Sequence, residues 1–415
     1  MPAAPEAHDV LVVGGGPAGA ACAYWLAEAG HDVLLLEKKR YPREKTCGDG
    51  LTPRAVKELE SMGLATSLAE HHRFDGLRSI AFGRTLELKW PSHPDFPSYG
   101  YVVTRKDLDH LVAERAVKSG ATLWQESEAL APVVEDGLVR GAVVKRKETG
   151  ATQEVRARYV VVADGSLSRF GRALGTSRNR AFPQGMAIRG YYVSPRHDEP
   201  WIESHLDVRD KQGNVLPGYG WIFPVGDGRV NVGVGLLSTF NQWKSVNTSH
   251  LMDAFVDWAP KSWELSPETS CGPPTGGRLP MSLSVGPRVG PTWLVVGDAG
   301  GAINPFNGEG IAYAYETGRM AADALDIALR TGNGLALRDY EQRLNTEYEL
   351  YYKVARAFVK LIGNPQAMRL LVSTGMHSRT LMEWVLRIMA NLLRPDELGP
   401  AEAAYKAVAL LARAA

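Results

Sequence analysis

A glycine-rich turn between two apolar runs is the feature that most constrains the fold of this chain. The segment reads DVLVVGGGPAGAACAYWLAEAGHDVLLLEK, and residues 10–13 and 33–36 have the apolar composition of short buried strands. A G-x-G-x-x-G sequence, residues 14–19, follows the first run and opens a helix-like stretch, residues 20–29. Glu37 ends the second run, 23 positions after the first glycine. This order predicts a βαβ unit that binds a dinucleotide.

Each glycine of the turn has a distinct physical task. Gly14 permits the tight turn, Gly16 lets the backbone approach a pyrophosphate, and Gly19 lets helix and strand pack closely. Pro17 and Ala18 stand at the start of the helix, whose free N–H groups and dipole attract an anion. The alternative is a βαβ unit without any ligand.

The acidic end of the second strand selects among dinucleotides. Glu37, followed by Lys38, is placed to accept hydrogen bonds from the hydroxyl groups of an adenosine ribose. Because a carboxylate at this point repels a 2′-phosphate, the pattern disfavours NADP as the resident ligand. FAD and NAD both remain compatible with it.

A second strand–loop–helix segment favours FAD. The sequence TWLVVGDAGGAINPFNGEGIAYAYETGRMAADAL predicts a buried strand at residues 293–296 and a helix from about Gly310. Asp298, at the end of that strand, is suited to accept the hydroxyl groups of a ribityl chain. Gly308, Gly310 and Ile311 open the helix, whose positive end stabilises the negative charge of a reduced flavin ring.

At this point the chain resembles the geranylgeranyl reductase, or prenyl-chain reductase, family of FAD-dependent oxidoreductases. The resemblance extends from residue 9 to about residue 324. It rests on the glycine turn with Glu37 and on the sequences YPREKTCGDGL, TRKDLDHLV, VVADGSLSRFGRALG, GDAGGAINPFNGEGI and PGYGWIFPVGDGRVNVGVG. The stretch CGDGLTPRAVKELESMGL is most similar to actinobacterial enzymes that saturate one double bond of the menaquinone side chain.

The family implies that the loop containing Cys47 lies along the flavin ring. Cys47 has no cysteine or histidine at metal-binding spacing and no evident base nearby, so a zinc site or a nucleophile is disfavoured. Gly48 and Gly50 leave room for a planar ring, and Asp49 lies between them. Three interpretations of Cys47 stay open: a positioning role, a redox or proton-donor role, and a buried thiol.

The resemblance also implies cofactor contacts from three further segments. Arg105, at the start of a helix-like stretch, is expected against the FAD phosphates. The strand backbone near Ala129 is expected to touch the adenine. The loop of Asp164 is expected near the pyrophosphate or an incoming nicotinamide, although Ser166 or Ser168 could instead cap a helix there.

Alternating aromatic residues in PGYGWIFP predict one wall of a substrate pocket. Tyr219, Trp221 and Phe223 occupy alternate positions and therefore share one face of a strand. Such a pattern also occurs in ordinary cores. The catalytic candidates are Cys47, Tyr219 and Trp221, and the proton donor is Cys47, Tyr219 or a flavin-bound water.

The motifs are interleaved along the chain, which predicts an α/β fold with a discontinuous Rossmann-type FAD-binding domain. Alternating patterns between the motifs predict an antiparallel substrate sheet, and the C-terminal part is expected to be helical. The predicted domains are FAD binding at 1–75, 100–175 and 285–330, the substrate sheet at 76–99 and 176–284, and the helical region at 331–415.

One C-terminal segment, TLMEWVLRIMANLLR, is apolar nearly all round. Glu383, Arg387 and Asn391 lie four residues apart and form a narrow polar stripe. A helix of this kind is expected to be packed in the protein, to border a prenyl chain or to lie against lipid.

The composition of the chain limits the classes of molecule that it is expected to bind and the compartment in which it is expected to work. A net charge of +1 gives no general field for nucleic acid. The three cysteines, Cys22, Cys47 and Cys271, do not form a disulfide framework, and the chain starts without a signal-peptide pattern. We therefore expect a cytoplasmic protein that associates with the membrane from the cytoplasmic side, because extracting a prenyl tail into water is costly.

The predicted activity is saturation of an isolated C=C bond in a polyprenyl chain, one isoprene unit of menaquinone, by hydride from reduced FAD. Since the chain carries a single dinucleotide fingerprint, its reductant (NADPH, NADH or reduced ferredoxin) is expected to bind transiently. The alternatives are reduction of geranylgeranyl diphosphate or geranylgeranyl glycerolipids, and aromatic hydroxylation or halogenation on the same fold.

Overall fold

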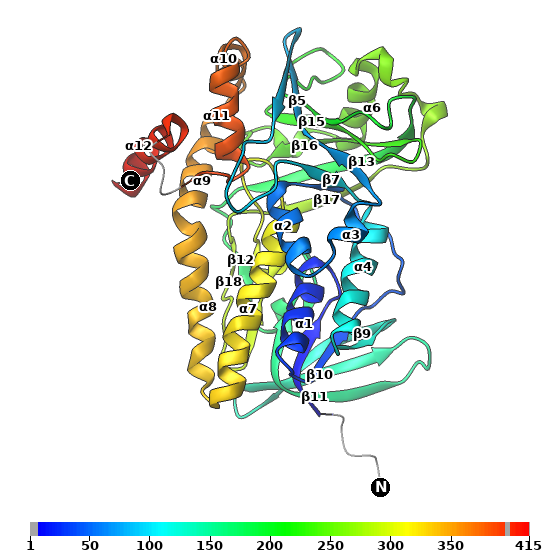
Figure 1. Cartoon of the computed structure of the whole chain (residues 1–415), viewed down its shortest axis with the longest axis vertical. Helices are drawn as coiled ribbons and strands as arrows, with labels where there is room; N and C mark the ends of the chain where they lie inside the picture. Colours follow the sequence, from blue (N-terminus) through cyan, green and yellow to red (C-terminus); the bar gives the residue numbers. More distant parts are fainter. Residues whose placement is uncertain (1–6, 395–398, 415) are drawn as a thin grey trace.

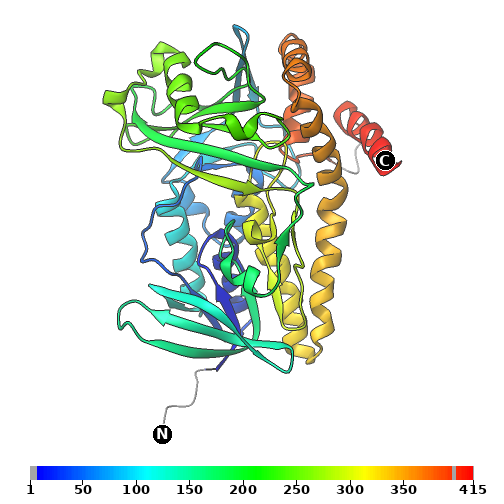
Figure 2. The ribbon, with the colours of Figure 1, turned by 180° about the vertical axis from the view of Figure 1, so that it is seen from behind.

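Two large sheets lie at opposite ends of the molecule, and a layer of helices runs along both (Figure 1). The computed structural model describes residues 7–394 and 399–414. Seen from behind, the first sheet lies at one end of the molecule and the second lies at the other (Figure 2). Long helices near the C-terminus span the distance between them.

The first sheet has seven strands and a parallel core. Strands β8, β2, β1, β11 and β19 pair in parallel, while β10 and β9 continue the sheet in antiparallel fashion. The bounds are β1 Ala7–Val13, β2 Val33–Leu36, β8 Thr122–Trp124, β9 Ser127–Glu135, β10 Leu138–Arg146, β11 Thr152–Val162 and β19 Trp293–Val295. Both faces of the parallel core are covered where β2, β19, residues 10–13 of β1 and residues 159–162 of β11 run side by side, so these stretches consist of uninterrupted apolar residues rather than alternating ones.

Helix α1 is the centre of the layer on one face of this sheet, where it packs between α4 and α7. Small residues on α1 allow the close approach, because Gly318 of α7 lies against the Ala18 carbonyl group. The helices of this part are α1 Pro17–Glu28, α2 Pro53–Ser61, α3 Ala65–Leu68, α4 Arg105–Lys118, α5 Arg169–Ala173 and α7 Ile311–Thr331.

The second sheet also has seven strands, in the order β17-β13-β16-β15-β14-β5-β6. Its bounds are β5 Gly76–Ala81, β6 Arg84–Lys89, β13 Gln184–Val193, β14 Trp201–His205, β15 Gly218–Pro224, β16 Arg229–Leu237 and β17 Thr275–Pro280. One pair, β14 and β5, is parallel, which corrects the expectation of a wholly antiparallel sheet. The two strands come from distant segments, so no hairpin turn fixes their relative direction. Helix α6, Thr248–Trp258, covers β16 and β13.

Short strands connect the two halves. Strands β3 Gly50–Leu51, β7 Gly100–Val102 and β4 His72–Phe74 form a small sheet, and β12 Ser177–Arg178 pairs with β18 Val285–Gly286. Strand β3 directly follows the Cys47 loop, so the small sheet holds that loop at the junction.

The C-terminal part is helical in the residues that the structure describes. Its helices are α8 Leu337–Leu344, α9 Leu350–Ile362, α10 Pro365–Gly375, α11 Arg379–Met389 and α12 Pro400–Ala414, with a π-helical turn Asn345–Glu349 between α8 and α9. Helix α11 ends at Met389, so Asn391 lies outside it and does not extend the predicted polar stripe. Only part of α11 is buried, chiefly Met382 and Leu386.

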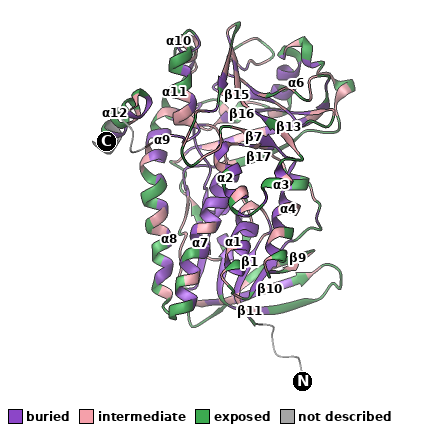
Figure 3. Ribbon diagram, viewed as in Figure 1, coloured by how far each residue is buried: buried purple, intermediate pink, exposed green. Residues whose placement is uncertain are grey.

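Burial is densest where α1, α7 and the parallel strands meet (Figure 3). A separate apolar cluster lies between the second sheet and α6. The predicted fold class is confirmed: a Rossmann-type domain is interleaved with a largely antiparallel sheet and followed by helices.

Candidate functional site

The glycine turn has the shape that a bound pyrophosphate requires. A β-carbon on Gly19 would lie 1.9 Å from the Gly14 carbonyl oxygen, and Gly14 itself has a φ of +109°. A β-carbon on Gly16 would meet nothing nearer than the Arg105 guanidinium at 4.0 Å. Thus Gly14 and Gly19 serve close packing, while Gly16 faces open space in front of the α1 N-terminus. These residues fit FAD.

Glu37 is held by a group of side chains that the sequence did not single out. Its carboxylate accepts a hydrogen bond from Arg43 at 2.8 Å, and Arg43 also contacts Asp109 at 2.8 Å. The Tyr41 hydroxyl donates to the Gly15 carbonyl oxygen. This cluster fixes the carboxylate beside the glycine turn, where an adenosine ribose is predicted to bind.

The second flavin motif meets the first at the N-termini of α1 and α7. A β-carbon on Gly310 would lie 3.1 Å from an Asp298 carboxylate oxygen, and one on Gly297 would lie 2.7 Å from the Ala18 side chain. Burial raises the pKa of Asp298, and the positive charges of Lys45 and Arg105 oppose that rise. The structure therefore places residues from both motifs around one point.

Arg105 lies beside that point in a defined geometry. Its guanidinium makes two hydrogen bonds to Asp109, of 2.7 and 2.8 Å, one helical turn further along α4. Thr104 is the N-cap residue of α4, and its hydroxyl oxygen accepts a hydrogen bond from the Asp107 amide. Charge, position and the nearby Gly16 make Arg105 suited to a phosphate group.

Three other predicted cofactor residues lie on the first sheet or its edge. Lys38 is exposed directly after Glu37, and Ala129 is on β9, where it pairs with Val144 of β10. One Asp164 oxygen accepts from the Phe170 amide at 3.0 Å, while Oδ1 has no hydrogen-bond partner. The predicted alternative at this loop is also present, because Ser168 caps α5.

The Cys47 loop is anchored by the second sheet. Asn231 of β16 donates to the Cys47 carbonyl oxygen at 2.9 Å and to the Asp49 carboxylate at 2.7 Å. Arg189 of β13 donates to the Cys47 carbonyl oxygen at 3.1 Å, and the Tyr191 hydroxyl donates to Asp49. The loop is therefore positioned by strands that are more than a hundred residues away in sequence.

Asp49 is fully buried and has a positive φ of 65°. Burial raises its pKa to about 6, and hydrogen bonds from Tyr191 and Asn231 and the charge of Arg189 limit that rise. Oδ2 of Asp49 accepts the hydrogen bonds from Tyr191 and Asn231, and Oδ1 accepts one from the Arg105 amide at 3.3 Å. Asp49 thus links the loop to the start of α4.

The three aromatic residues of β15 face this loop. A β-carbon on Gly48 would lie 3.4 Å from both Trp221 and Phe223, and one on Gly50 would lie 3.0 Å from Phe223. Trp221 stacks at an angle against Tyr219, with ring centroids 5.8 Å apart. The space on the side-chain side of Gly48 and Gly50 is therefore taken by Trp221 and Phe223, which corrects the expectation that both glycines leave that space to a planar ring.

Polar contacts hold two of these aromatic residues. The Trp221 indole donates to Asn231 at 2.9 Å, and the Tyr219 hydroxyl donates to the Asn307 carbonyl oxygen at 2.6 Å. Asn307 belongs to the second flavin motif, so Tyr219 connects the substrate sheet to it. Burial raises the pKa of Tyr219 to about 12, with Cys47 and Glu309 adding to the rise.

Cys47 is a protonated thiol in this setting. Burial raises the pKa of Cys47, and the charge of Arg105 only partly opposes the rise. Because the thiolate is the reactive form, Cys47 is poorly suited to act as a nucleophile.

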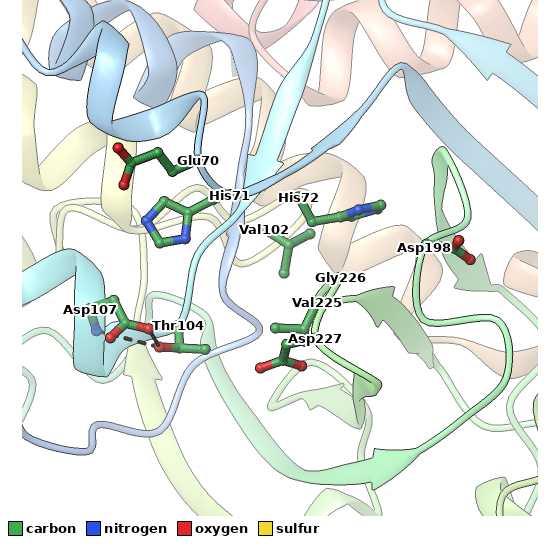
Figure 4. A pocket seen from close by; sticks show the side chains of 10 residues that line it. All are labelled: Glu70, His71, His72, Val102, Thr104, Asp107, Asp198, Val225, Gly226 and Asp227. Carbon is green, nitrogen blue, oxygen red and sulfur yellow. Dashed lines mark hydrogen bonds between the residues drawn. The ribbon is translucent and has the colours of Figure 1, made fainter.

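A cavity of about 350 Å³ opens beside the N-terminus of α4 (Figure 4). Acidic and histidine side chains surround it, and its lining contains no lysine or arginine among the described residues. The lining residues are Glu70, His71, His72, Val102, Thr104, Asp107, Asp198, Val225, Gly226 and Asp227. Its carboxylates would repel a pyrophosphate, so we do not assign the cofactor to it.

Sequence reasoning missed several residues of the site. Tyr41 and Arg43 belong to the quoted YPREKTCGDGL motif, and Glu309 belongs to GDAGGAINPFNGEGI, so a charged residue inside each motif was the available signal. Asn231 lies inside the quoted motif PGYGWIFPVGDGRVNVGVG, whereas Arg189 lies outside the motifs. Neither could be assigned, because a single polar residue on a predicted strand does not indicate which loop it will contact.

Comparison with known proteins identifies the family. A family model described as an FAD binding domain matches residues 7–205. A menaquinone reductase of Mycolicibacterium smegmatis is 40% identical over 395 residues, which cover 94% of this chain and 93% of that protein. The chain belongs to the FAD-dependent prenyl-chain reductase family.

A more distant relative and a solved structure are also similar to this chain. A digeranylgeranylglycerophospholipid reductase of Methanopyrus kandleri is 33% identical and aligns over 85% of this reductase and 90% of its own length. A solved structure of a geranylgeranyl bacteriochlorophyll reductase-like protein from Thermoplasma acidophilum has a TM-score of 0.80 and 24% identity, covering 98% of this chain and 100% of its own. That likeness concerns the fold.

Proposed function

We propose that this reductase saturates one isoprene double bond of menaquinone. The main support is the meeting of the Cys47 loop, the Tyr219–Phe223 aromatic face and the second flavin motif in one place. The menaquinone reductases that share 40–42% identity with the chain favour a quinone over other prenyl carriers.

Bound FAD, in its reduced form, would supply the hydride. Gly16 and Arg105 would receive its pyrophosphate, Glu37 its adenosine ribose and Asp298 its ribityl chain. Its ring would lie along the Cys47 loop, whose Gly48 and Gly50 pack against Trp221 and Phe223. The aromatic face then excludes water and orients an apolar chain, which has no polar group of its own for recognition near an internal double bond.

The electron donor is part of the proposal. We infer that NADH, NADPH or reduced ferredoxin binds only transiently, because the sequence carries a single dinucleotide fingerprint. The acidic cavity of Figure 4 disfavours a phosphate-bearing donor at that place. Anaerobic reduction of the purified yellow holoenzyme by each donor would identify it from the rate of flavin bleaching.

Lipid analysis tests the substrate. Deletion of the gene is expected to leave one more double bond in the side chain of the host's menaquinone, which lowers the mass of that quinone by two hydrogen atoms. Complementation with the gene is expected to restore the original mass. Unchanged quinones with more unsaturated polar lipids would refute the menaquinone assignment in favour of glycerolipids, the substrate class in the name of the Methanopyrus relative. Oxygen-dependent product from an aromatic acceptor would refute both.

We further propose that α10 and its neighbouring turns rest on a bilayer surface. Leu370 and Leu371 are 67% and 43% exposed, and Leu361 is 53% exposed. Two exposed cations, Lys360 and Arg369, stand beside these leucines and complement anionic headgroups. No helix in the described parts of the chain has the length and apolarity needed to cross a membrane.

Helix α11 connects this surface to the site. Its last carbonyl group, of Met389, accepts from Asn304 at 2.9 Å and from Asn307 at 3.2 Å, both in the second flavin motif. Eleven residues of helix span about 16 Å. A prenyl tail following α11 would reach the site without leaving an apolar environment.

Flotation with anionic vesicles tests the membrane surface. Leu370→Glu with Leu371→Glu is expected to leave the protein at the bottom of the gradient, whereas the wild type floats. The control is Leu335→Glu, because Leu335 is equally exposed, at 62%, but lies in the turn between α7 and α8. Equal flotation of all three proteins would rule out α10 as the docking surface.

A further inference from the structure

Glu309 occupies a fixed position between the Cys47 loop and the start of α7. It precedes Gly310, the N-cap residue of α7, and its amide donates to the Asn307 side chain at 2.9 Å. Its Oε1 atom accepts a hydrogen bond from the Thr52 hydroxyl. Because Thr52 directly follows β3, the carboxyl group of Glu309 is tied to the loop that faces the aromatic residues.

The second oxygen of this carboxyl group has no assigned task. Oε2 of Glu309 is inaccessible to solvent and lacks a hydrogen-bond partner in the described part of the structure. Buried carboxyl oxygens rarely lack a hydrogen-bond partner, unless the carboxyl group is protonated or the oxygen contacts a bound ligand. The charge of Arg54 acts on Glu309, but the terminal nitrogens of its guanidinium bind Glu316 at 2.7 Å and the Asn391 carbonyl oxygen at 3.0 Å.

The groups around Glu309 keep a large fraction of its carboxyl group protonated near neutral pH. Burial raises the pKa of Glu309 to about 7; Glu316 adds to the rise, while Thr52 and Arg54 oppose it. The titratable and charged groups close enough to interact with it come from several elements, and they are Arg54, Tyr219, Tyr313, Glu316 and Tyr351.

Glu309 compares favourably with the other acids of the site. The pKa of Tyr219 is raised to about 12, and that of Cys47 is raised by burial. Asp49 also has a pKa near neutrality, at about 6, but both of its carboxylate oxygens already accept hydrogen bonds. General acids work best when their pKa lies near the working pH. An isolated double bond offers no conjugated acceptor for charge, so it needs a strong, well-placed proton donor.

We propose that Glu309 is the acid that protonates the alkene during prenyl reduction. This inference rests on the proposed function. One alkene carbon gains a hydride, which removes two electrons from the reduced cofactor. The π electron pair takes the proton of the Glu309 carboxyl group at the other carbon, leaving a carboxylate that regains a proton from water entering the site when the product leaves.

The decisive variant is Glu309→Gln in the FAD-loaded enzyme. Reoxidation of the reduced flavin by menaquinone under anaerobic conditions is expected to slow by about 100-fold, the usual contribution of a general acid. Flavin content and the rate of flavin reduction by the donor are expected to stay at wild-type values. The wild-type rate should fall above about pH 7, where Glu309 loses its proton.

The variant Thr52→Val tests the proton-donor role through a shift in the pH dependence of the rate. A purely structural role of Glu309 would not produce such a shift. Thr52 is the N-cap residue of α2 but makes no side-chain cap hydrogen bond, so valine should not weaken the helix. Removing the hydroxyl deletes a contact that lowers the pKa of Glu309. The fall in rate is therefore expected at higher pH in Thr52→Val than in the wild type.

Stability of the cofactor-free chain provides a readout independent of turnover. Since the folded pKa of Glu309 is above its unfolded value, wild-type stability should decline as pH rises from about 4.5 to about 7. Glu309→Gln should lack this part of the decline.

The outcomes separate the two proposals. A wild type that menaquinone does not reoxidise refutes the proposed function, and the proton-donor role with it. A wild type that turns over while Glu309→Gln keeps its rate and pH profile refutes the proton-donor role alone. Loss of turnover with intact flavin reduction, together with the Thr52→Val shift, supports it.

Discussion

At the scale of single residues, the glycines of the turn divide into two kinds, as the sequence motif predicts. Gly14 and Gly19 are required by backbone contacts within the protein, whereas Gly16 is next to open space. The two kinds should therefore respond differently to the same added methyl group.

We predict that Gly16→Ala folds normally but loses FAD, and that Gly19→Ala is destabilised by about 1–3 kcal/mol through overpacking. Chemical denaturation of the cofactor-free chain and FAD titration would separate the two effects. Gly277→Ala is the control, because its added carbon would meet nothing within 4 Å. Equal stability of the Gly16 and Gly19 variants would contradict the prediction.

Asp49 provides a residue-scale test of pH dependence. Its folded pKa of about 6 lies above its ordinary value of 3.8, so its contribution to stability is present at low pH and is lost as pH rises through 6. Relative to Asp49→Asn, the wild type should lose about 2–3 kcal/mol between pH 4 and pH 6. Urea melts at several pH values measure this, with the exposed Asp136→Asn as control.

At the scale of secondary-structure elements, strands β13, β15 and β16 position the Cys47 loop as well as the aromatic face. Trp221 donates to Asn231, and Asn231 in turn donates to the Cys47 carbonyl oxygen and to Asp49. One polar chain therefore couples the aromatic wall to the loop. A displacement of β16 is therefore expected to displace the Cys47 loop.

We predict that Trp221→Phe destabilises the protein by about 1–3 kcal/mol, because the buried Asn231 oxygen loses its donor. Amide hydrogen exchange in residues 45–51 should increase as well. Trp258→Phe is the matched control, since Trp258 is 58% exposed on α6. Unchanged exchange in the loop would mean that the coupling is absent.

At the scale of the whole molecule, a buried ion pair joins the flavin domain to the C-terminal helices. Arg54 of α2 binds Glu316 of α7 and the Asn391 carbonyl group after α11, and the Tyr348 hydroxyl donates to Glu316. The guanidinium group of Arg54 therefore holds together helix α2, helix α7 and the segment after α11.

Removing only one partner of this pair should cost far more than replacing both. Arg54→Met is expected to lose about 3–5 kcal/mol, because Glu316 remains buried without its cation. Arg54→Met with Glu316→Gln should recover much of the loss, and glutamine still accepts from Tyr348. Thermal and urea unfolding of the single and double variants would decide, and equal losses in both would contradict the argument.

The sequence by itself determined the parts of this protein whose requirements are local. The 33–36 strand, the glycine turn and the helix after it were predicted with nearly correct bounds, because steric demands on three glycines and an apolar run act within about thirty residues. The motif resemblance likewise predicted the FAD-dependent prenyl-chain reductase family, and the 40% identical relative confirms it.

Only the tertiary structure decided which distant side chains meet. The Glu309–Thr52 contact joins residues 257 positions apart, and Arg189 reaches the Cys47 loop across 142 positions. The parallel pairing of β14 with β5 is of the same kind. Such contacts depend on how complete sheets and helices pack, and no local preference of either residue encodes its partner.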